Sequence, residues 1–458
     1  MSNVILELPK PQPKQEMFLK ARKKYIGFGG ARGGGKSFAV RIKSILLALK
    51  HGGIRILIVR RTFPELKRNH IEPMRKLLYP LIKEKKVKYN QTDKMFRFFN
   101  DSIIEFMYCE NETDTDRLQG AEYDVIFIDE ATQLLEKQIK DIAVCVRGVN
   151  NFPKHVYFTC NPGGRGHGYI KRIFIDKKYL SGEKPEEYEF IQSKVSDNKA
   201  LMTFQPDYVA QLEALPPKRR RAWLDGDWDV YEGQFFDDFV NDPDHYGDGL
   251  YTHVIEPFAP PKRWQIYRSY DFGYGKPFSC GWWAVDEEGV MYRIHEYYGC
   301  EKDEENVGVK MTPDQQFREI SRIEQTHKWL KGKNIYGIAD PSIWDGSRGE
   351  SVAETAEKYG VYFEPGDNAR VAGWMQCHYR LQFDHNGFPM MYVFNTCEAF
   401  IRTIPVLISS DTNPEDLDTT MEDHVADEWR YMCMSRPITP PESPLKEIPA
   451  DDPLNLYH

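Results

Sequence analysis

Short apolar runs alternate with amphipathic stretches over the first 180 residues. The stretch Ser37–Lys50 repeats apolar residues at helical spacing. Five apolar runs have the length and composition of buried strands: Tyr25–Gly29, Ile54–Arg60, Ser102–Met107, Asp124–Asp129 and His155–Cys160. Strands that alternate with helices are typical of a parallel sheet, so we expect residues 1–180 to form one α/β core.

A second alternating pattern begins at Trp264 and predicts another α/β domain over residues 263–435. The polar segment Asp286–Gly289 predicts a hairpin turn, so the strands around it should form an antiparallel meander. The expected elements are strands Gln265–Asp271, Cys280–Val285 and Val290–Tyr298, a helix at about 312–330, strand Ile335–Asp340 and a helix at about 421–433.

Three segments outside these domains differ in composition. Residues 181–240 are polar and charged, and we expect a small helical lid or linker subdomain there. Residues 241–262 are rich in Pro, Gly and Asp, which predicts a turn-rich linker. Residues 436–458 predict an extended Pro-rich tail.

Composition limits the class of protein without choosing a function. With 458 residues, 41% of them hydrophobic, the chain has enough apolar material for more than one core. Its net charge of −8 neither favours nor excludes nucleic acid, because only the contacting surface of a DNA-binding protein must be basic. The 8 cysteines include no Cys-x-x-Cys pair, and no run approaches the roughly 18 apolar residues of a membrane span. We therefore expect a reduced, intracellular protein without a zinc site and without a membrane segment.

A glycine-rich motif follows the first predicted strand. From Gly30 to Ser37 the chain reads Gly-Ala-Arg-Gly-Gly-Gly-Lys-Ser, which satisfies the pattern GxxxxGK[ST] at the start of a predicted helix. Glycines such as Gly30, Gly33 and Gly35 let backbone N–H groups curl around phosphates. Lys36 would reach the β- and γ-phosphates and Ser37 would ligate Mg²⁺, so the motif predicts binding of ATP with Mg²⁺. The alternative is an ordinary glycine-rich turn.

Two acids end the fourth predicted strand. Asp129 and Glu130 follow an apolar run, at the carboxyl end where parallel sheets bind their ligands. We expect Asp129 to bind Mg²⁺ and Glu130 to act as the general base for an attacking water. The adjacent pair favours ATP hydrolysis over kinase-type transfer, because a water nucleophile needs a nearby base. A solvated strand end is the alternative interpretation.

Five further polar residues are candidates for the nucleotide site. Gln15 precedes the loop, and its amide can pair with the edge of adenine. Thr159 and Asn161 end the next strand and are candidate sensors of the γ-phosphate. Arg32 in the loop and Arg147 after the acidic strand are alternative arginine fingers, the first acting in the same subunit and the second on a neighbour. Each of the five also has an ordinary structural explanation, as a surface charge or a strand-end turn.

Three aspartates of the second domain form another candidate site. Asp271 ends its first strand, Asp340 ends a later strand, and Asp427 lies in the last helical pattern. Carboxylates suit Mg²⁺ or Mn²⁺, and two such ions roughly 4 Å apart stabilise the attacking and leaving oxygens of a phosphoryl displacement. The alternative is that each acid merely caps a strand or a helix.

Neighbouring residues compete for roles in this site. Asp423 precedes Asp427 by four residues and therefore shares a helix face with it. Asp423 and His424 are candidate auxiliary groups, as is Asp345. Glu296, on the third strand of the meander, is a rival second metal ligand.

Together these motifs resemble the large subunit of a tailed-phage DNA-packaging terminase. The resemblance covers about residues 13–435, and the order of the acids, on a first strand, a later strand and a final helix, is similar to that of ribonuclease-H-like nucleases. The motifs are Lys14-Gln15, Gly30–Ser37, Arg60-Arg-Thr62, Arg117-Leu-Gln-Gly120, Asp129-Glu130, Thr159-Cys-Asn-Pro162, Gly226-Asp-Trp228, Tyr270-Asp-Phe-Gly273, Ala339-Asp-Pro-Ser342 and Asp427-Glu-Trp-Arg-Tyr431.

The resemblance implies a P-loop NTPase domain with a parallel sheet, followed by a ribonuclease-H-like α/β nuclease domain. It implies ATP-driven translocation of double-stranded viral DNA into a procapsid, and two-metal endonucleolytic cutting of concatemeric DNA. The implied partners are the portal protein, a small terminase subunit and further copies of the chain in a ring, commonly of five. The implied location is the host cytoplasm, with docking on the portal. Gly33-Gly34-Gly35 departs from members that have a side chain there, which leaves the position of the finger arginine open.

Other interpretations remain open at this stage. A packaging motor should grip the phosphate backbone without reading bases, but charge runs are usually solvated faces. One rival function is a helicase- or repair-type ATPase whose second domain only binds DNA, and another is a nucleotide-dependent capsid component that does not translocate. Candidate basic contacts are Lys67-Arg68, Arg75-Lys76, Lys83–Lys86, Lys218–Arg221 and Arg165–Gly168.

Overall fold

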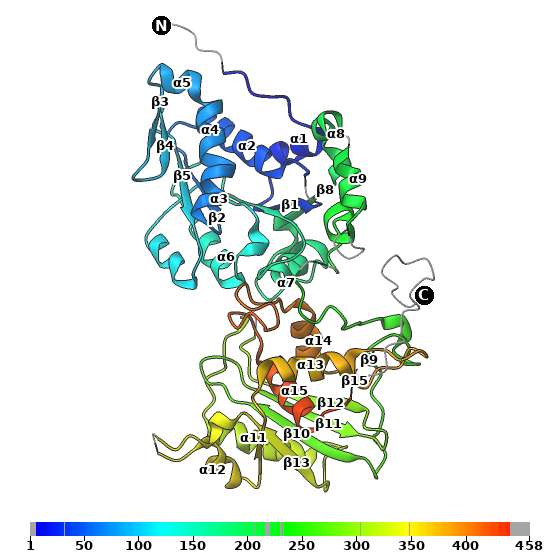
Figure 1. Ribbon diagram of the computed structural model, residues 1–458. Coiled ribbons are helices and arrows are strands. Elements are labelled where there is room, and N and C mark those ends of the chain that lie inside the picture. The colour runs from blue at the N-terminus through cyan, green and yellow to red at the C-terminus, as the bar shows by residue number, and fades with distance from the viewer. Residues whose placement is uncertain are drawn as a thin grey trace, which may run out of the picture. The chain divides into compact units, whose positions relative to one another are not determined.

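The chain divides into two compact units (Figure 1). The computed structural model describes residues 6–31, 33–205, 207–215, 220–229, 231, 233–302, 304–347 and 349–439. Unit 1 comprises Met1–Phe235 together with Val406–Ser409, and unit 2 comprises Phe236–Pro405 together with Ser410–His458. The chain therefore leaves unit 1 after Phe235, returns to it for a short segment, and leaves again.

Unit 1 is built on a sheet with the strand order β3-β4-β5-β2-β6-β7-β1-β8. The strands from β5 to β8 in this order pair in parallel, and β3 and β4 form an antiparallel extension at one edge. The bounds are β1 Tyr25–Gly30, β2 Arg55–Arg60, β3 Val87–Asn90, β4 Met95–Phe98, β5 Ile103–Tyr108, β6 Val125–Ile128, β7 His155–Cys160 and β8 Tyr188–Ser193.

Helices cover both faces of this sheet, because its central strands are apolar on both sides. In β6, Val125 and Phe127 enter one buried cluster, while Ile126 and Ile128 enter another. Such continuous burial is the reason why this strand is a run of apolar residues rather than an alternation. In the described part of unit 1, the helical segments of four or more residues are α1 Pro13–Lys20, α2 Lys36–Lys50, α3 Phe63–Leu66, η1 Lys67–Ile71, α4 Glu72–Leu77, α5 Tyr79–Lys83, η2 Glu112–Leu118, α6 Glu136–Ala143, α7 His167–Ile170, η4 Lys171–Ile175, α8 Lys199–Phe204, α9 Asp207–Glu213 and η7 Arg221–Asp225.

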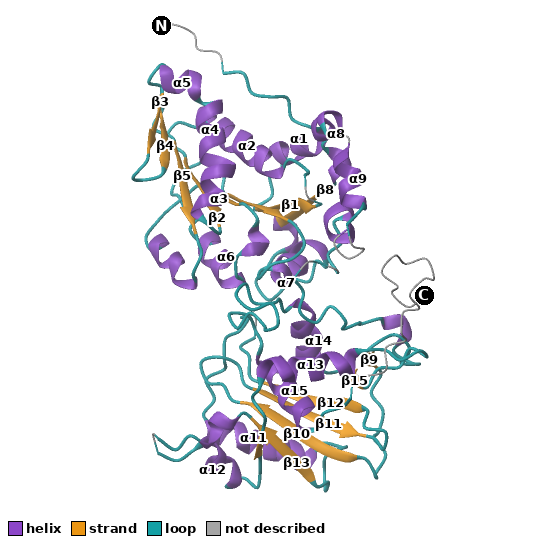
Figure 2. Cartoon of the chain, viewed as in Figure 1, coloured by secondary structure: helices purple, strands orange, loops and turns teal. Residues whose placement is uncertain are grey.

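Unit 2 contains a sheet with the order β14-β13-β10-β11-β12-β15-β9 (Figure 2). Its first three long strands form an antiparallel meander, and β13 and β14 are added in parallel on the other side of β10. This is the strand arrangement of a ribonuclease-H-like fold. The bounds are β9 Val254–Ile255, β10 Gln265–Asp271, β11 Ser279–Val285, β12 Met291–Tyr298, β13 Ile335–Ala339, β14 Glu364–Pro365 and β15 Met391–Phe394.

The two faces of β10 meet different helices. The ring of Tyr270 packs against Phe317 of α11, whereas Ser269 donates a hydrogen bond to Glu428 of α15. Because side chains alternate along a strand, Asp271 lies on the same face as Ser269, under α15. The helices are α11 Pro313–Thr326, α12 Val352–Glu357, α13 Arg370–Leu381, α14 Glu398–Thr403 and α15 His424–Ser435.

The strands and long helices expected from the sequence are present in both units, with end shifts of a few residues. Five strand regions were not expected: besides the three described next, these are β14 and β15 of unit 2, which lie between β13 and α15 in the chain. The β3–β4 hairpin follows α5, β8 lies within residues 181–240, and β9 lies within residues 241–262, where it pairs with β15. Of the expected tail, only residues 436–439 are described. No helix in the described part of the chain is long and apolar enough to cross a membrane.

Candidate active sites

The glycine-rich loop joins β1 to α2 and is supported from both sides. Gly33 and Gly35 have φ of +79° and +72°, a region that costs little only for glycine. Gln15 of α1 donates its amide N–H to the Gly35 carbonyl at 3.1 Å. Asn198 donates to the Gly33 carbonyl at 2.6 Å, so the loop is held in shape by its neighbours. The amide of Gln15 thus contacts the loop backbone, and its expected contact with adenine stays a prediction.

Lys36 lies within the curve of the loop. Its ammonium donates to the Ala31 carbonyl at 2.6 Å and to Oδ1 of Asn161 at 2.7 Å. Gly30, at the start of the loop, has a φ of +127° and lies against the backbone of β8. A buried ammonium between a loop carbonyl and the end of β7 is suitably placed to meet an anion in the loop.

Asp129 receives donors from four sides. The hydroxyl of Ser37 lies 3.2 Å from both carboxylate oxygens, and the hydroxyl of Thr159 donates to Oδ1 at 2.5 Å. Arg60 Nη1 lies 2.6 Å and His70 Nε2 lies 2.8 Å from Oδ2. Burial alone would raise the pKa of Asp129, but His70, Arg60 and Thr159 outweigh it and hold this pKa well below its usual range. The carboxylate is therefore ionised, as a ligand of a hard cation must be.

Glu130 is tied to the same network. Its backbone N–H donates to the hydroxyl of Thr159 at 2.9 Å, and its carboxylate lies 2.8 Å from Arg60 Nη2. The residue has a φ of +55°, an uncommon conformation for a side chain of this kind. Burial raises the pKa of Glu130 although Arg60 opposes this shift. A raised pKa makes the carboxylate a stronger base.

His70 is the residue of this site that the sequence did not indicate. It lies on η1, a π-helical turn between α3 and α4, and is completely buried against Asp129. The segment Lys67-Arg-Asn-His70-Ile reads as an exposed charged stretch, so no sequence pattern singles out the histidine. Arg60 had been noted only as part of a motif, without a role.

Of the two candidate finger arginines, the structure describes only Arg147. Arg32 lies outside the described residues. Arg147 is half exposed, and its side chain donates a hydrogen bond to the Ala121 carbonyl at 3.3 Å. Ala121 lies before β6 in the chain, whereas Asp129 directly follows β6. Arg147 is therefore at the opposite end of this strand from the glycine-rich loop, and its role as an arginine finger stays a prediction.

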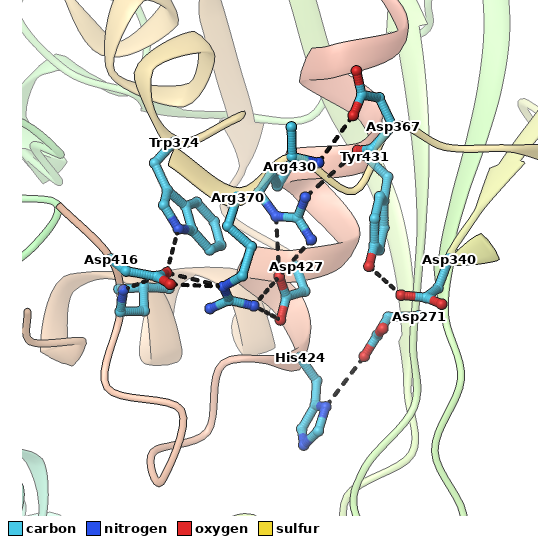
Figure 3. Close-up of polar contacts among 12 residues, drawn as sticks. Asp271, Asp340, Asp367, Arg370, Trp374, Asp416, His424, Asp427, Arg430 and Tyr431 are labelled. Atoms are coloured by element: carbon cyan, nitrogen blue, oxygen red, sulfur yellow. Dashed lines mark hydrogen bonds and ion pairs between the residues drawn. The ribbon is translucent and has the colours of Figure 1, made fainter. Parts of the chain in front are cut away.

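In unit 2, the sheet and α15 gather the predicted acids (Figure 3). Asp271, at the end of β10, lies 3.2 Å from Nδ1 of His424. Asp340, just after β13, accepts from the Ser342 N–H at 2.6 Å and from the hydroxyl of Tyr431. Because β10 and β13 are adjacent and parallel, their carboxyl ends bring the two aspartates to one edge.

Asp427, the third predicted acid, is held by two arginines. Its carboxylate lies 3.1 and 3.2 Å from Arg370 Nη1, and Oδ1 lies 2.9 Å from Arg430 Nη2 (Figure 3). Among the described residues there is no group of three or more His, Cys, Asp or Glu arranged to hold a metal ion. The role of Asp427 as a metal ligand therefore stays a prediction.

Asp423 emerges as a fourth acid of the site. Its side chain is only 6% exposed and has no hydrogen-bond partner within the described part of the chain. Burial, with Asp427 and Asp271 nearby, raises the pKa of Asp423 to about 7. Burial and the same crowding raise the pKa of Asp271 to about 6, although His424 opposes this shift. Mutually repelling carboxylates of this kind are a donor set that a divalent cation would stabilise.

The remaining acids have structural roles. Glu428 is completely buried and accepts from Ser269, Ser279 and Trp283, with Arg293 at 2.7 Å, so it fixes α15 on the sheet. Glu296, the rival ligand, accepts the Ala399 and Phe400 N–H groups at the start of α14. Asp345 is exposed and accepts from the Ser347 N–H. None of these three is among the partners that shift the pKa of Asp271.

These features define two kinds of centre in one chain. A glycine-rich loop with a lysine, a serine and a following acid pair on a parallel sheet defines unit 1 as a P-loop NTPase. A ribonuclease-H-like sheet with acids at its carboxyl edge defines unit 2. Residues 22–226 match the family model described as the phage terminase large subunit.

Solved terminase structures are similar over most of the chain. The large terminase of a thermophilic bacteriophage is 20% identical, with 93% of this chain and 99% of that chain covered and a TM-score of 0.41. The large terminase of bacteriophage HK97 is 11% identical, with 93% and 95% covered and a TM-score of 0.49. The nuclease domain of the P22 large terminase is 18% identical, with 40% and 87% covered and a TM-score of 0.31. No curated protein matches.

Proposed function

We propose that this chain is an ATP-driven DNA-packaging motor joined to an endonuclease. In this proposal, unit 1 hydrolyses ATP to move double-stranded viral DNA into a procapsid, and unit 2 cuts concatemeric DNA. The observation that carries the proposal is that one chain combines a terminase-family P-loop unit with a crowded aspartate site on a ribonuclease-H-like sheet.

Binding of ATP and Mg²⁺ is assigned to the glycine-rich loop. The bound Mg²⁺ would neutralise charge on the phosphates, and Ser37 and Asp129 would hold it. The donor set fits, because the Ser37 hydroxyl lies 3.2 Å from an ionised carboxylate. Backbone N–H groups near Gly33 and Gly35 would wrap the phosphates, and Lys36 would turn from its carbonyl partner toward them.

Hydrolysis is assigned to Glu130 as the general base. Its raised pKa supports this role, and the hydroxyl of Thr159 connects it to Asp129. Asn161, which accepts from Lys36, is placed to sense whether the lysine is engaged with phosphate. Arg32 or Arg147 would stabilise the charge of the transition state, the first within the subunit and the second across a subunit boundary.

Gln15 and the lid complete the proposed nucleotide site. Gln15 would keep its contact with Gly35 and present the rest of its amide to adenine. Residues 181–240 are proposed as a lid or linker subdomain, supported by the bond from Asn198 to Gly33. The limits of this subdomain and of the linker 241–262 are part of the proposal.

DNA cleavage is assigned to the acids of unit 2. Asp271, Asp340 and Asp427, with Asp423, would hold Mg²⁺ or Mn²⁺, and a pair of such ions would stabilise the attacking and leaving oxygens. The fit is supported by the raised pKa values of Asp271 and Asp423, which a cation would bring down. Tyr431 fixes the orientation of Asp340 by its hydroxyl.

The partners follow from the family. We propose that copies of the chain form a ring, commonly of five, on the portal protein of the procapsid in the host cytoplasm, and that a small terminase subunit selects the DNA. The match to the terminase family supports this arrangement. Contacts to the DNA backbone are proposed for the basic segments, including Lys67 and Arg68 on η1.

Two substitutions test the two activities separately. Lys36→Ala should reduce ATP turnover at least about 100-fold and leave metal-dependent plasmid cutting intact, because the loop loses its phosphate-binding cation. Asp271→Asn should abolish cutting and leave ATP turnover intact. Lys50→Ala, at the end of α2, and Asp314→Asn, on α11, are matched controls that should change neither activity.

The same variants separate the rival functions. If Asp271→Asn still cuts DNA, the proposed nuclease site is wrong, and the result would favour a helicase- or repair-type ATPase whose second domain only binds DNA. Packaging that continues in Lys36→Ala without ATP turnover would favour a capsid component that does not translocate.

A further inference from the structure

Arg370, the first residue of α13, lies among the acids of unit 2 (Figure 3). Nη1 contacts Asp427, while Nε lies 2.9 and 3.1 Å from the two carboxylate oxygens of Asp416. The guanidinium also packs over the ring of Trp374 at 5.2 Å. One cation is thus shared between two carboxylates that belong to different segments of the chain.

One nitrogen of the Arg370 guanidinium lacks a hydrogen-bond acceptor among the described residues. Its Nη2 is buried and has no hydrogen-bond partner among the described residues, an arrangement that costs free energy. Asp423, four residues before Asp427, is buried, and its side chain has no hydrogen-bond partner in the described chain. Arg370 therefore brings a positive charge, with one N–H donor to spare, to a site that contains, within the described residues, a buried carboxylate without a donor.

Arg430, the second arginine that contacts Asp427, is more deeply buried than Arg370. Arg430 is only 2% exposed at its side chain, and lies within 5.1 Å of the Trp374 ring and 4.5 Å of the Tyr431 ring. Arg370 is 29% exposed and has a second anchor in Asp416. Arg430 is consequently fixed by packing, whereas Arg370 can rotate away from Asp427 and keep an ion pair.

We propose that Arg370 is a built-in counter-ion of the acid site, which stands in for the divalent cation and competes with it. When a cation enters among Asp271, Asp423 and Asp427, Nη1 leaves Asp427 while Nε stays on Asp416. Arg370 is then a positioning residue that sets the metal concentration needed to assemble the site. This inference rests on the metal site of the proposed function.

The experiment is calorimetric titration of Mn²⁺ alone into the full chain, without nucleotide or DNA. Arg370→Gln should tighten the Asp271-dependent binding of Mn²⁺ about tenfold, because a competing charge near the acids is removed. Arg370→Lys keeps the charge and should remain within about twofold of the unchanged protein. Arg322→Gln, an exposed arginine of α11 paired with Glu319, removes the same charge elsewhere and should have no effect.

Thermal unfolding gives an independent measurement. Without metal, Arg370→Gln should lower the Tm, because the acids lose their counter-ion, and Mn²⁺ should raise the Tm more in this variant than in the unchanged protein. Equal or weaker Mn²⁺ binding by a folded Arg370→Gln protein would overturn the inference. If instead Asp271→Asn leaves Mn²⁺ binding unchanged, the metal site itself is misplaced and the proposed function fails first.

Discussion

The two acid sites of this chain hold their aspartates in opposite ways. Asp129 in unit 1 receives four donors, two of them from Arg60 and His70, and its pKa lies well below the usual range. In unit 2 the pKa values of Asp271 and Asp423 are raised to about 6 and about 7, with burial as the first cause. Hydrogen-bond donors of the protein thus surround the aspartate in unit 1, whereas other carboxylates lie near the aspartates in unit 2.

In unit 1 the protein itself balances the charge of the acid site, whereas in unit 2 it does so only in part. The charge of Asp129 is balanced by the protein, so its position is set before nucleotide arrives. The acids of unit 2 are balanced only in part, so their arrangement depends on the cation that enters. Removing the carboxylate of Asp129 should therefore destabilise unit 1, whereas removing that of Asp423 should stabilise metal-free unit 2.

The largest expected effect is that of Asp129→Asn. The substitution leaves Arg60 and His70 buried without their anion, so the free energy of unfolding should fall by about 3–5 kcal/mol. Hydrogen exchange at the amides of β2 and β6 measures this loss in unit 1 alone. Asp116→Asn, at an exposed position of the same unit, is the control. Unchanged exchange in Asp129→Asn would mean that the donors around Asp129 do not depend on its charge.

A smaller effect is expected at His70. His70→Leu removes one donor from Asp129 and should cost about 1–3 kcal/mol, with a fall in kcat of about tenfold and a smaller change in KM. His70→Gln can offer an N–H in place of Nε2 and should recover most of the turnover. If the leucine and glutamine variants lose the same activity, His70 contributes packing and not a hydrogen bond to Asp129.

The smallest effect, with the opposite sign, is expected at Asp423. Its pKa is raised in the folded protein, so its ionisation opposes folding, and this loss of stability develops as the pH rises from about 4 to about 7. In EDTA at pH 8, Asp423→Asn should therefore be more stable than the unchanged protein by about 1–2 kcal/mol, and at pH 4 the two should coincide. Chemical unfolding at both pH values measures the difference. A variant that is less stable at pH 8 would remove the contrast between the two sites.

The features that could be predicted from the sequence are those formed by residues close together in the chain. The glycine-rich loop, Asp129 and Glu130 are contiguous motifs next to apolar strands, and the strands themselves follow from runs of buried residues. Asp271 and Asp340 were expected at strand ends because each directly follows the apolar residues of a predicted strand.

The parts that were not predictable depend on tertiary contacts. His70 reaches Asp129 through a π-helical turn, and no periodicity in its charged segment reveals it. Asp427 pairs with Arg430, three residues away, and also with Arg370, which is far away in the sequence, and the second pairing depends on the fold. Strands β3, β4, β8 and β9 are short or partly exposed, so their residues lack the apolar runs that mark the central strands.

The return of Val406–Ser409 to unit 1 has a consequence for dissecting the molecule. The Phe235 N–H donates to the Leu407 carbonyl, the Ser409 N–H donates to the Gly233 carbonyl, and Gln234 forms a β-bridge with Ile408. A fragment that stops at Phe235 would expose these backbone groups as an open edge, to which another fragment can add. We therefore expect a truncated ATPase fragment to self-associate unless the peptide 406–409 is supplied in trans or fused to its end.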